Sequence, residues 1–509
     1  MLAASFPKFG HPAFAWGALA PLVVAVALAT AQRATAGRVF ALGLTAGAVY
    51  FGGTLYWVVA VMAGYGGLAI PVAVLVGLLL AAYLSLYPAL FALLVRRAVQ
   101  RFGVAGVWLA PLFWVSTEWV RATIGGGFPW VLLGASQASV LPVVQFASLV
   151  GVYGLSALVA LVATAAAACT LSRETRHRRG AFAVALLLAV ISGWGTWRVA
   201  DSSLTTQGDV TRIGLVQGSV AQEDKYDPAH RAEIMARYID LSRQVLGARA
   251  DLVIWPEAAT PFYFDIDSVL AQPIRKLAAE AHTPFLIGTD ELDRATPGQR
   301  ERYYNAAVLV GSDGRTKASY RKQHLVPFGE YVPLKSVLFF VGPLVEAVSD
   351  FSAGAEAVVF DANGRRLSVA ICYESVYPSI ARAFVNQGSE LLATITNDAW
   401  FGRSSAAYQH FSQGALRAVE QGRYVVRAAN TGISGAVDPY GRVLAATPLF
   451  EPATVTVDVH LLRSHTIYNR TGDVVAWVAL AATALVVAVG VRRPIGQLPS
   501  STKDPRHDA

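Results

Sequence analysis

Residues 366–375, RLSVAICYES, form a short apolar run that ends at Cys372, Tyr373 and Glu374. Continuous apolar runs of this length are typical of strands that are buried on both faces. The stretches DLVIWPE (251–257) and ELLATITND (390–398) have the same form, an apolar run followed by polar residues. Because ligands bind at the carboxyl ends of strands in such sheets, these stretches predict an α/β sheet with a functional site at its edge.

The sequence around these stretches alternates between strand and helix patterns from residue 201 to residue 472. We expect further strands at 212–220, 284–292 and 305–314, a hairpin at 433–449, and helices at 229–246, 268–281 and 415–429. This alternation predicts an α/β domain whose helices cover a largely buried sheet. The nine histidines follow no metal-binding spacing, so we expect no metal and no other cofactor.

The flanks of this region are strongly apolar. Of the 509 residues, 54% are hydrophobic and only 15% are charged, whereas soluble proteins average about 25% charged residues. Apolar runs long enough to cross a bilayer lie at 12–31, 39–62, 68–95, 104–120, 143–170, 181–199 and 474–491. We therefore predict a bundle of about seven spanning helices, with a helical bundle at 1–200, the α/β domain at 201–472, a closing helix at 473–492 and a polar tail at 493–509.

The formal net charge of +8 arises in the apolar half of the chain. Residues 1–200 contain 12 Lys or Arg side chains, and their only acidic residues are Glu118 and Glu174. The arginines cluster in every second loop, at 33–38, 96–101 and 173–179. Loops of this kind face the cytoplasm, so we expect the α/β domain and the N-terminus outside it and the tail inside. The basic charge thus reports membrane topology, and we expect no binding of nucleic acid.

The loop 121–142 contains the glycine-rich, aromatic stretch GGGFPWVLLGASQ. Two interpretations remain open: a re-entrant loop, which is tolerated where it lines a cavity or is buried in protein, or an interfacial loop with aromatic anchors. Glu118 and Arg121, three residues apart, are expected to form an ion pair at a helix end.

The chain has two cysteines in different surroundings, which excludes a disulfide framework. Cys169, in a stretch of small residues, is expected to serve helix packing. Cys372 is either a small buried apolar residue or a nucleophile, which needs a nearby base or cation. Glu257 follows the apolar run LVIWP, and Lys322 lies in the stretch YRKQHLVPFGEYVP. Glu257 is therefore a candidate proton acceptor, and Lys322 is a candidate stabiliser of a thiolate and an oxyanion.

Three short motifs, WPE (255–257), RKQHLVPFGE (321–330) and CYES (372–375), resemble the Glu–Lys–Cys motifs of the nitrilase superfamily in order and in spacing. The resemblance implies an α-β-β-α sandwich. It also implies Glu257 as the general base, Lys322 as the electrostatic stabiliser and Cys372 as the nucleophile.

Nearly the whole chain resembles the apolipoprotein N-acyltransferases of bacterial inner membranes. The matching stretches are AAYLSLYPALFA (81–92), FPWVLLGASQ (128–137), LVQGSV (215–220), HLVPFGEYVP (324–333), CYES (372–375), TNDAWFG (396–402) and RAANTGISG (427–435). The resemblance implies transfer of an acyl chain from a membrane phospholipid, through a Cys372 thioester, to the N-terminal amine of a diacylated apolipoprotein. It implies a multi-pass protein of the bacterial inner membrane with a periplasmic catalytic domain, and we expect a monomer.

The same resemblance gives supporting roles to Glu330, Tyr373 and Glu374. Two features depart from the family. Tyr226 stands where a tryptophan is expected. The stretch FPKFGHPAFAW (6–16) resembles the segment after the family's first helix, so that this first of eight helices is expected to be missing.

Further residues are candidates for supporting roles. Asn397 and Asp398 follow a predicted strand and are expected to bind or position substrate, and Trp400 and Phe401 are expected to line an acyl pocket. Residues 326–345 are either a lid that touches the membrane or ordinary core. Arg417, Glu420 and Arg423 are expected to form an ion-pair network on the helix 415–429.

Two other functions fit part of the sequence. A membrane-tethered amidase has the same three residues but uses water as the acceptor. A transporter or receptor with an outer binding domain is the second alternative, although transporters usually carry paired ionisable groups within the membrane.

Overall fold

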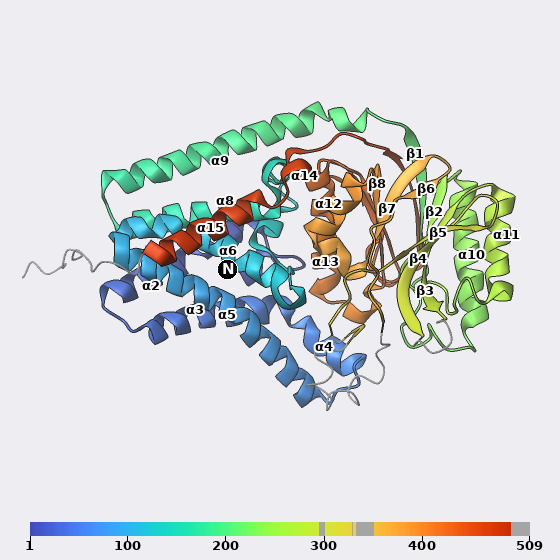
Figure 1. Cartoon of the computed structure of the whole chain (residues 1–509), viewed down its shortest axis with the longest axis horizontal. Helices are drawn as coiled ribbons and strands as arrows, with labels where there is room; N and C mark the ends of the chain where they lie inside the picture. Colours follow the sequence, from blue (N-terminus) through green and yellow to red (C-terminus); the bar gives the residue numbers. More distant parts are fainter. Residues whose placement is uncertain (295–300, 328, 332–350, 490–509) are drawn as a thin grey trace, which may run out of the picture.

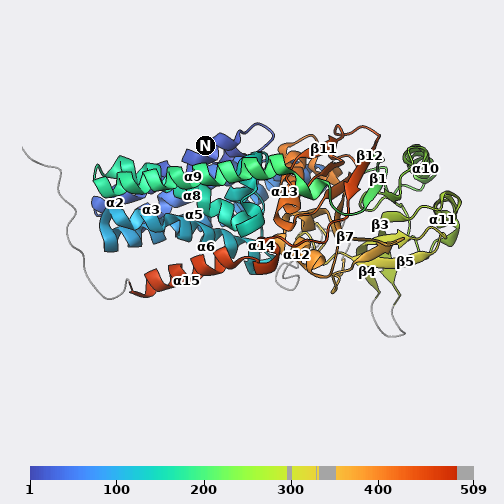
Figure 2. The same ribbon diagram turned by 90° about the horizontal axis from the view of Figure 1, so that it is seen from above.

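The computed structural model describes residues 1–294, 301–327, 329–331 and 351–489. A helical bundle and an α/β domain lie end to end along the long axis of the molecule (Figures 1 and 2). The bundle contains α1 (Ala15–Ala18), α2 (Ala20–Ala31), α3 (Ala36–Leu55), α4 (Trp57–Gly64), α5 (Ile70–Phe102), α6 (Ala110–Thr123), α7 (Leu141–Val144), α8 (Ala147–Leu171), α9 (Thr175–Asp201) and α15 (Val474–Val489).

The described residues contain five helical runs that are long and apolar enough to cross a membrane, at Pro12–Ala31, Ala36–Leu55, Ile70–Gly126, Ala147–Leu171 and Thr175–Thr205, and a shorter apolar helix at Val474–Ala488. The run Ile70–Gly126 contains both α5 and α6, which fold back on each other. The predicted spans 68–95 and 104–120 therefore correspond to two helices of this run, α5 and α6, between which the chain reverses its direction.

Two of the predicted spans differ from the helices of the structure. The span 39–62 is divided at Tyr56 into α3 and α4. The span 104–120 begins as a 3-10 helix, Gly103–Leu109, because Gly103 (φ 61°) ends α5 and Pro111 lies in the first turn of α6. The 14 residues of α6 correspond to about 21 Å, less than the roughly 30 Å of a hydrocarbon core.

The three arginine-rich loops gather at the end of the bundle far from the α/β domain (Figure 1). Arg96 Nη2 donates to the carbonyl of Ala34 at 3.4 Å. This contact joins the first of these segments to the end of α5, because residues 96–101 are helical and not a loop. Near the third loop, Trp108 Nε1 donates to His177 Nδ1 at 3.1 Å. Cys169 is exposed, and its thiol lies 3.8 Å from the carbonyl oxygen of His177. The cysteine thus contacts α9 from an exposed position on α8, and its expected role in helix packing stays a prediction.

The α/β domain consists of two six-stranded sheets. The first has the order β12-β1-β2-β3-β4-β5 and the second β11-β10-β9-β8-β7-β6. Their strands are β1 (Val210–Gln217), β2 (Leu252–Ile254), β3 (Phe285–Asp293), β4 (Arg302–Val310), β5 (Thr316–Arg321), β6 (Phe360–Ala362), β7 (Arg365–Ile371), β8 (Leu391–Thr396), β9 (Val425–Ala429), β10 (Gly435–Val437), β11 (Val443–Ala446) and β12 (Ala453–His460). The centre of each sheet is parallel, β1-β2-β3 in one and β7-β8-β9 in the other.

Apolar side chains of the two sheets share one core, which includes Leu215 and Ile254 from the first sheet and Val369 and Ile395 from the second. The helices α10 (Arg231–Gly247) and α11 (Ser268–Ala281) cover the outer face of the first sheet, while α12 (Pro378–Asn386) and α13 (Ser405–Gln421) cover the second (Figure 1). The domain is thus an α-β-β-α sandwich, and the predicted fold class is confirmed.

The expected helix 415–429 is wrong in its second half. α13 ends at Gln421, Gly422 follows with φ 61° in the left-handed region, and residues 425–429 form β9. The run Tyr424, Val425, Val426 favours a strand, and β9 pairs in parallel with β8. The hairpin expected at 433–449 is confirmed by β10 and β11. β5, β6, β12 and α12 were not anticipated.

In the loop after α6, residues 129–137 are buried between the bundle and α13, whereas Gly125 and Gly126 are exposed. Trp130 Nε1 donates to Gln409 Oε1 at 2.8 Å, and the amide of Val131 donates to Gln413 Oε1 at 2.9 Å. Arg121 Nη1 donates to the carbonyl of Trp130 at 2.8 Å, and Glu118 Oε1 accepts from the amide of Leu133 at 2.7 Å. Of the two interpretations, burial in protein is the one that holds. Among the described ion pairs, Glu118 and Arg121 are not paired with each other, because each binds the loop backbone.

Candidate active site

The three predicted catalytic residues come from different strand ends. Glu257 lies three residues beyond β2, Lys322 directly follows β5, and Cys372 directly follows β7. All three are buried, and Lys322 Nζ lies 3.5 Å from Glu257 Oε1. Burial and the charge of Glu257 raise the pKa of the Cys372 thiol, while Lys322 opposes this effect. The fold therefore brings the three residues into one electrostatically coupled site.

Cys372 occupies a strained turn between β7 and the 3-10 helix Cys372–Val376. Its φ of 54° lies in the left-handed region, where a residue with a Cβ is disfavoured by about 1–2 kcal/mol. The carbonyl oxygen of Cys372 accepts from His410 Nε2 and from Ser375 Oγ, both at 3.0 Å. These contacts hold the nucleophile in its turn, and strain of this kind is common at functional sites.

The Glu257 carboxylate is fully engaged. Its Oε1 accepts from Asn305 Nδ2 at 2.7 Å, and its Oε2 accepts from the amide of Asn397 at 2.7 Å. Burial alone raises the pKa of this carboxyl, but the charge of Lys322 and these hydrogen bonds outweigh burial, so that the pKa lies below its ordinary value. Glu257 is therefore an anion at neutral pH and can accept a proton.

Glu330 completes the charge balance around Lys322. Lys322 Nζ donates to Glu330 Oε1 at 2.8 Å, and Asn305 Nδ2 donates to the same oxygen at 2.8 Å. Glu330 Oε2 accepts from the amide of Val326 at 2.8 Å. Burial lowers the pKa of Lys322, but Glu330 and Glu257 raise it above its ordinary value, so the ammonium stays charged.

Glu374 ties the nucleophile turn to the segment that follows Lys322. Its Oε1 accepts from Tyr320 Oη at 2.9 Å and from the amide of Gln323 at 2.7 Å, and its Oε2 accepts from the amide of Ile371 at 2.8 Å. Burial raises the pKa of Glu374 to about 6, although these hydrogen bonds lower it. Glu374 thereby holds the Cys372 turn and the segment after Lys322 together.

Aromatic side chains lead from the nucleophile turn towards the bundle. The ring of Tyr373 stacks on Trp130 with centroids 6.1 Å apart, and Phe401 packs against Trp130 at 6.0 Å and against Trp57 of α4 at 5.0 Å. Trp400 is 40% exposed and contacts Tyr65 at 5.2 Å. Phe401 therefore joins the buried aromatic cluster, whereas Trp400 lies at its edge.

The remaining candidates divide into two groups. The Asn397 side chain bridges Gln222 Oε1 (2.6 Å) and Asn430 Nδ2 (3.0 Å). Tyr226 is 52% exposed and donates to Asp290 Oδ2 at 3.2 Å. Of these two residues, only Asn397 contacts the Glu257 carboxylate, through its backbone amide, so Tyr226 is the more peripheral residue.

Two expectations about charged residues are corrected. Asp398 is buried beside His410 Nδ1 (3.0 Å) and Arg427 Nη2 (2.8 Å), so it does not face a substrate. Arg417 pairs with Glu420 at 3.0 Å, but Arg423 lies beyond α13 and donates to the carbonyls of Ser389 and Gly422. The expected network is therefore a pair. The lid expected at 326–345 falls mostly outside the described residues.

Three buried residues of the site were not predicted from the sequence: Asn305, Lys225 and His410. Asn305 lies in β4, and the single polar residue in YYNAAVLV was a usable signal. Lys225 Nζ donates to the carbonyl of Glu257 at 3.2 Å, and burial lowers its pKa to about 8. Nothing in the polar loop EDKYDP or in the helix around His410 marks either residue.

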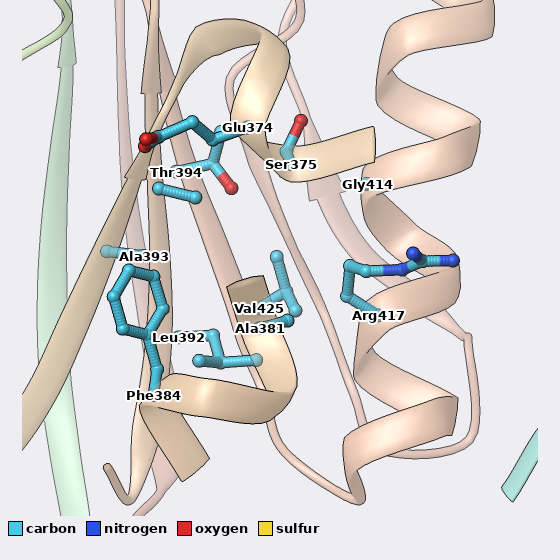
Figure 3. A pocket seen from close by; sticks show the side chains of 11 residues that line it. Glu374, Ser375, Ala381, Phe384, Leu392, Ala393, Thr394, Gly414, Arg417 and Val425 are labelled. Atoms are coloured by element: carbon cyan, nitrogen blue, oxygen red, sulfur yellow. The ribbon is translucent and has the colours of Figure 1, made fainter. Parts of the chain in front are cut away.

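A small pocket lies behind the nucleophile turn, between α12, α13 and β8 (Figure 3). Its lining includes Glu374 and Ser375 of the turn, Phe384 of α12, Leu392 of β8 and Arg417 of α13. Cys372, Glu257 and Lys322 do not line it. The pocket is therefore a packing defect beside the candidate site and not the place of reaction.

Strand-end Glu, Lys and Cys residues on an α-β-β-α sandwich are typical of a nitrilase-type domain. A model of the carbon-nitrogen hydrolase family matches residues 212–466, and a model of the apolipoprotein N-acyltransferase N-terminal domain matches residues 1–165. Among solved structures, an amidase of the nitrilase superfamily from Nesterenkonia is 21% identical with a TM-score of 0.39, and the match covers 52% of this chain and 95% of that one. The family model over residues 212–466 shows that the α/β domain is of the carbon-nitrogen hydrolase class.

Relatives that match nearly the whole chain identify the family within this class. The apolipoprotein N-acyltransferase of Geobacter metallireducens is 40% identical, and the match covers 97% of this chain and 94% of the relative. That of Methylococcus capsulatus is 34% identical, and the match covers 94% and 93%. The chain belongs to the apolipoprotein N-acyltransferase family.

Proposed function

We propose that the chain transfers an acyl group from a membrane phospholipid to the N-terminal amine of a diacylated apolipoprotein, through a thioester on Cys372. The single observation that carries this proposal is the coupled site of Glu257, Lys322 and Cys372 at the end of the α/β domain that adjoins an apolar bundle. Family membership supports the reaction class, since the relatives are named for it.

In the first half-reaction Cys372 attacks the ester carbonyl of the phospholipid. The thiol is protonated at rest because burial raises its pKa, so attack requires a base. Glu257 takes the thiol proton, and Lys322 and the amide of Tyr373 stabilise the oxyanion. When the tetrahedral intermediate collapses, the carbon–oxygen bond breaks, Glu257 returns the proton to the departing alkoxide, and a lysophospholipid leaves.

In the second half-reaction the neutral α-amino group of the acceptor attacks the thioester. Glu257 takes a proton from the attacking nitrogen, the carbon–sulfur bond breaks, and the proton returns to the Cys372 thiolate. The products are an amide and the free enzyme. A thioester is reactive towards amines, but it must be protected from water. The aromatic cluster of Trp57, Trp130, Tyr373 and Phe401 supports this role, because it covers the approach to the nucleophile from the bundle.

On this proposal the arginine-rich end of the bundle faces the cytoplasm, and the α/β domain lies on the periplasmic side of a bacterial inner membrane. Both lipid substrates then enter from the bilayer. A single copy of the protein suffices for the reaction.

The test is acylation of a diacylated lipopeptide in membranes that contain a labelled phospholipid. Cys372→Ala should abolish transfer of label to the lipopeptide amine. Cys169→Ala is the matched control, because Cys169 is exposed at the far end of the bundle, and it should retain full transfer. Transfer by Cys372→Ala, or release of free fatty acid by the wild type in place of amide formation, contradicts the proposal.

A further inference from the structure

A buried polar cluster lies behind the nucleophile turn, on the α13 side of the second sheet. Its members are His410 of α13, Asp398 after β8 and Arg427 of β9, each at most 4% exposed. His410 Nδ1 lies 3.0 Å from Asp398 Oδ1 and 2.9 Å from Arg427 Nη2, and Arg427 Nη2 also donates to Asp398 Oδ2 at 2.8 Å. The reaction steps above use none of these side chains.

The other ring nitrogen of His410 connects this cluster to the nucleophile. His410 Nε2 lies 3.0 Å from the carbonyl oxygen of Cys372 and 3.0 Å from Ser375 Oγ. A carbonyl oxygen can only accept, so Nε2 carries a proton and donates it to the Cys372 carbonyl. With Nε2 protonated, Nδ1 accepts from Arg427 Nη2, which itself pairs with Asp398, and this contact at the opposite edge of the ring leaves His410 little freedom to turn.

The position of this carbonyl determines where the next amide points. A trans peptide is planar, so the C=O of Cys372 and the N–H of Tyr373 point in opposite directions. His410 holds the carbonyl on the α13 side. The N–H of Tyr373 is thereby turned away from α13, towards the first sheet, whose strands β2 and β5 precede Glu257 and Lys322. This amide also lies in the first turn of a helix, where N–H groups have no partner within the helix.

We propose that His410 is a positioning residue that fixes the Cys372–Tyr373 peptide and so aims the Tyr373 amide at the oxyanion. The inference rests on the proposed thioester chemistry, and it adds a residue that touches no reacting atom. The Cys372–Tyr373 peptide needs this fixation because the φ of Cys372 lies in the left-handed region. A strained peptide relaxes when its hydrogen bonds are removed.

Two amide substitutions of His410 distinguish a role in orienting the Tyr373 amide from a role in core packing alone. In His410→Gln the side-chain amide nitrogen reaches the position of Nε2 and can donate to the Cys372 carbonyl. In His410→Asn the amide reaches only the position of Nδ1, so contact with Asp398 is possible, but the Cys372 carbonyl loses the donor from α13 and keeps only Ser375 Oγ. His177→Asn is the matched control, because it removes another buried histidine, one that binds Trp108 in the bundle.

The measurement is the single-turnover rate of acyl-thioester formation with phospholipid alone, across phospholipid concentrations, together with thermal unfolding of each purified variant. We expect His410→Asn to lower the saturating rate by about 10²-fold, the scale of losing one oxyanion donor, with an unchanged half-saturating concentration. His410→Gln should recover most of the rate, and His177→Asn should match the wild type.

Several results overturn the inference. It fails if His410→Asn forms the thioester at the wild-type rate, or if a folded His410→Gln is as slow as His410→Asn. It also fails if the loss appears only in the half-saturating concentration. Should His410→Asn not fold, the rate of His410→Gln against the wild type decides alone. A wild type that forms no thioester contradicts the proposed function instead, so the two failures are distinguishable.

Discussion

At the scale of single residues, Asn305 bridges the two carboxylates of the candidate site. One amide nitrogen donates to both Glu257 Oε1 (2.7 Å) and Glu330 Oε1 (2.8 Å). This bridge lowers the pKa of Glu257 and keeps the base ionised beside a second carboxylate. An apolar or acidic residue at this position removes that effect.

Replacing Asn305 with Ala should therefore change the pH dependence of the reaction. The lost hydrogen bond raises the pKa of Glu257, and only the ionised carboxylate can accept the thiol proton. The acidic limb of the kcat/KM profile should move to higher pH by about one to two units, the value of a hydrogen bond to a charged group. The pH profile of acyl transfer measures this. An unshifted acidic limb would show that Asn305 does not tune the base.

Glu374 shows a second residue effect, the cost of leaving buried donors without an acceptor. Its carboxylate accepts from one hydroxyl and three backbone amides, those of Ile371, Gln323 and His324. In Glu374→Gln one oxygen becomes an amide that cannot accept. We expect a loss of about 2–4 kcal/mol of unfolding free energy, together with slower acyl transfer. Denaturant unfolding of the purified protein measures the first effect, and unaltered stability would contradict it.

At the scale of elements, the sequence identified the site where chemistry follows a strand directly. Glu257 and Cys372 could be predicted because an apolar run stops just before each of them, whereas the strand before Lys322, TKASYR, is not apolar and only the motif RKQHLVPFGE marked this residue. His410 could not be predicted, because a helix presents its faces according to the packing around it. Residues 409, 413 and 420 of α13 bind the bundle, while 410 binds the nucleophile turn. No pattern in SAAYQHFSQGALRAVEQ distinguishes these two faces.

The end of α13 was misplaced for a related reason. The helix ends because Gly422 adopts φ 61° and the strand-favouring residues after it pair in parallel with β8, and the predicted helix 415–429 took account of neither. Gly422→Ala should cost about 1–2 kcal/mol of stability, because a Cβ is disfavoured in this conformation and would lie 3.0 Å from Thr466 Cγ2. Gly247→Ala is the control, since a Cβ there meets no atom within 4 Å. Equal unfolding temperatures for the two variants would contradict this account.

At the scale of the whole molecule, the bundle and the α/β domain are joined through α13 and the loop after α6. The sequence predicted both parts and left the loop's role open, because a loop's burial depends on what packs over it. Trp130 is 1% exposed and contacts Tyr373, Phe401 and Gln409. The loop thus connects the bundle to the nucleophile turn.

Removing this side chain should affect both stability and catalysis. Trp130→Ala leaves a cavity between the two parts, and we expect a loss of about 3–5 kcal/mol in unfolding free energy with greatly reduced acyl transfer. Trp197→Ala provides the comparison, because Trp197 is 63% exposed on α9, and its activity should be unchanged. If Trp130→Ala acylates the lipopeptide as fast as Trp197→Ala, the loop does not connect the bundle to catalysis.

The central claim is that Cys372 carries the acyl group between the two substrates. Its most direct test is the intact mass of the wild-type protein after incubation with a phospholipid of one acyl composition and no acceptor. We predict a mass increase of one acyl group, located on Cys372 by peptide analysis, which disappears when a diacylated lipopeptide is added and reappears on the lipopeptide amine. Cys372→Ser should accumulate little or no acyl-enzyme. An unmodified wild-type enzyme that still acylates the lipopeptide, or an acyl group that the acceptor cannot remove, would contradict the account.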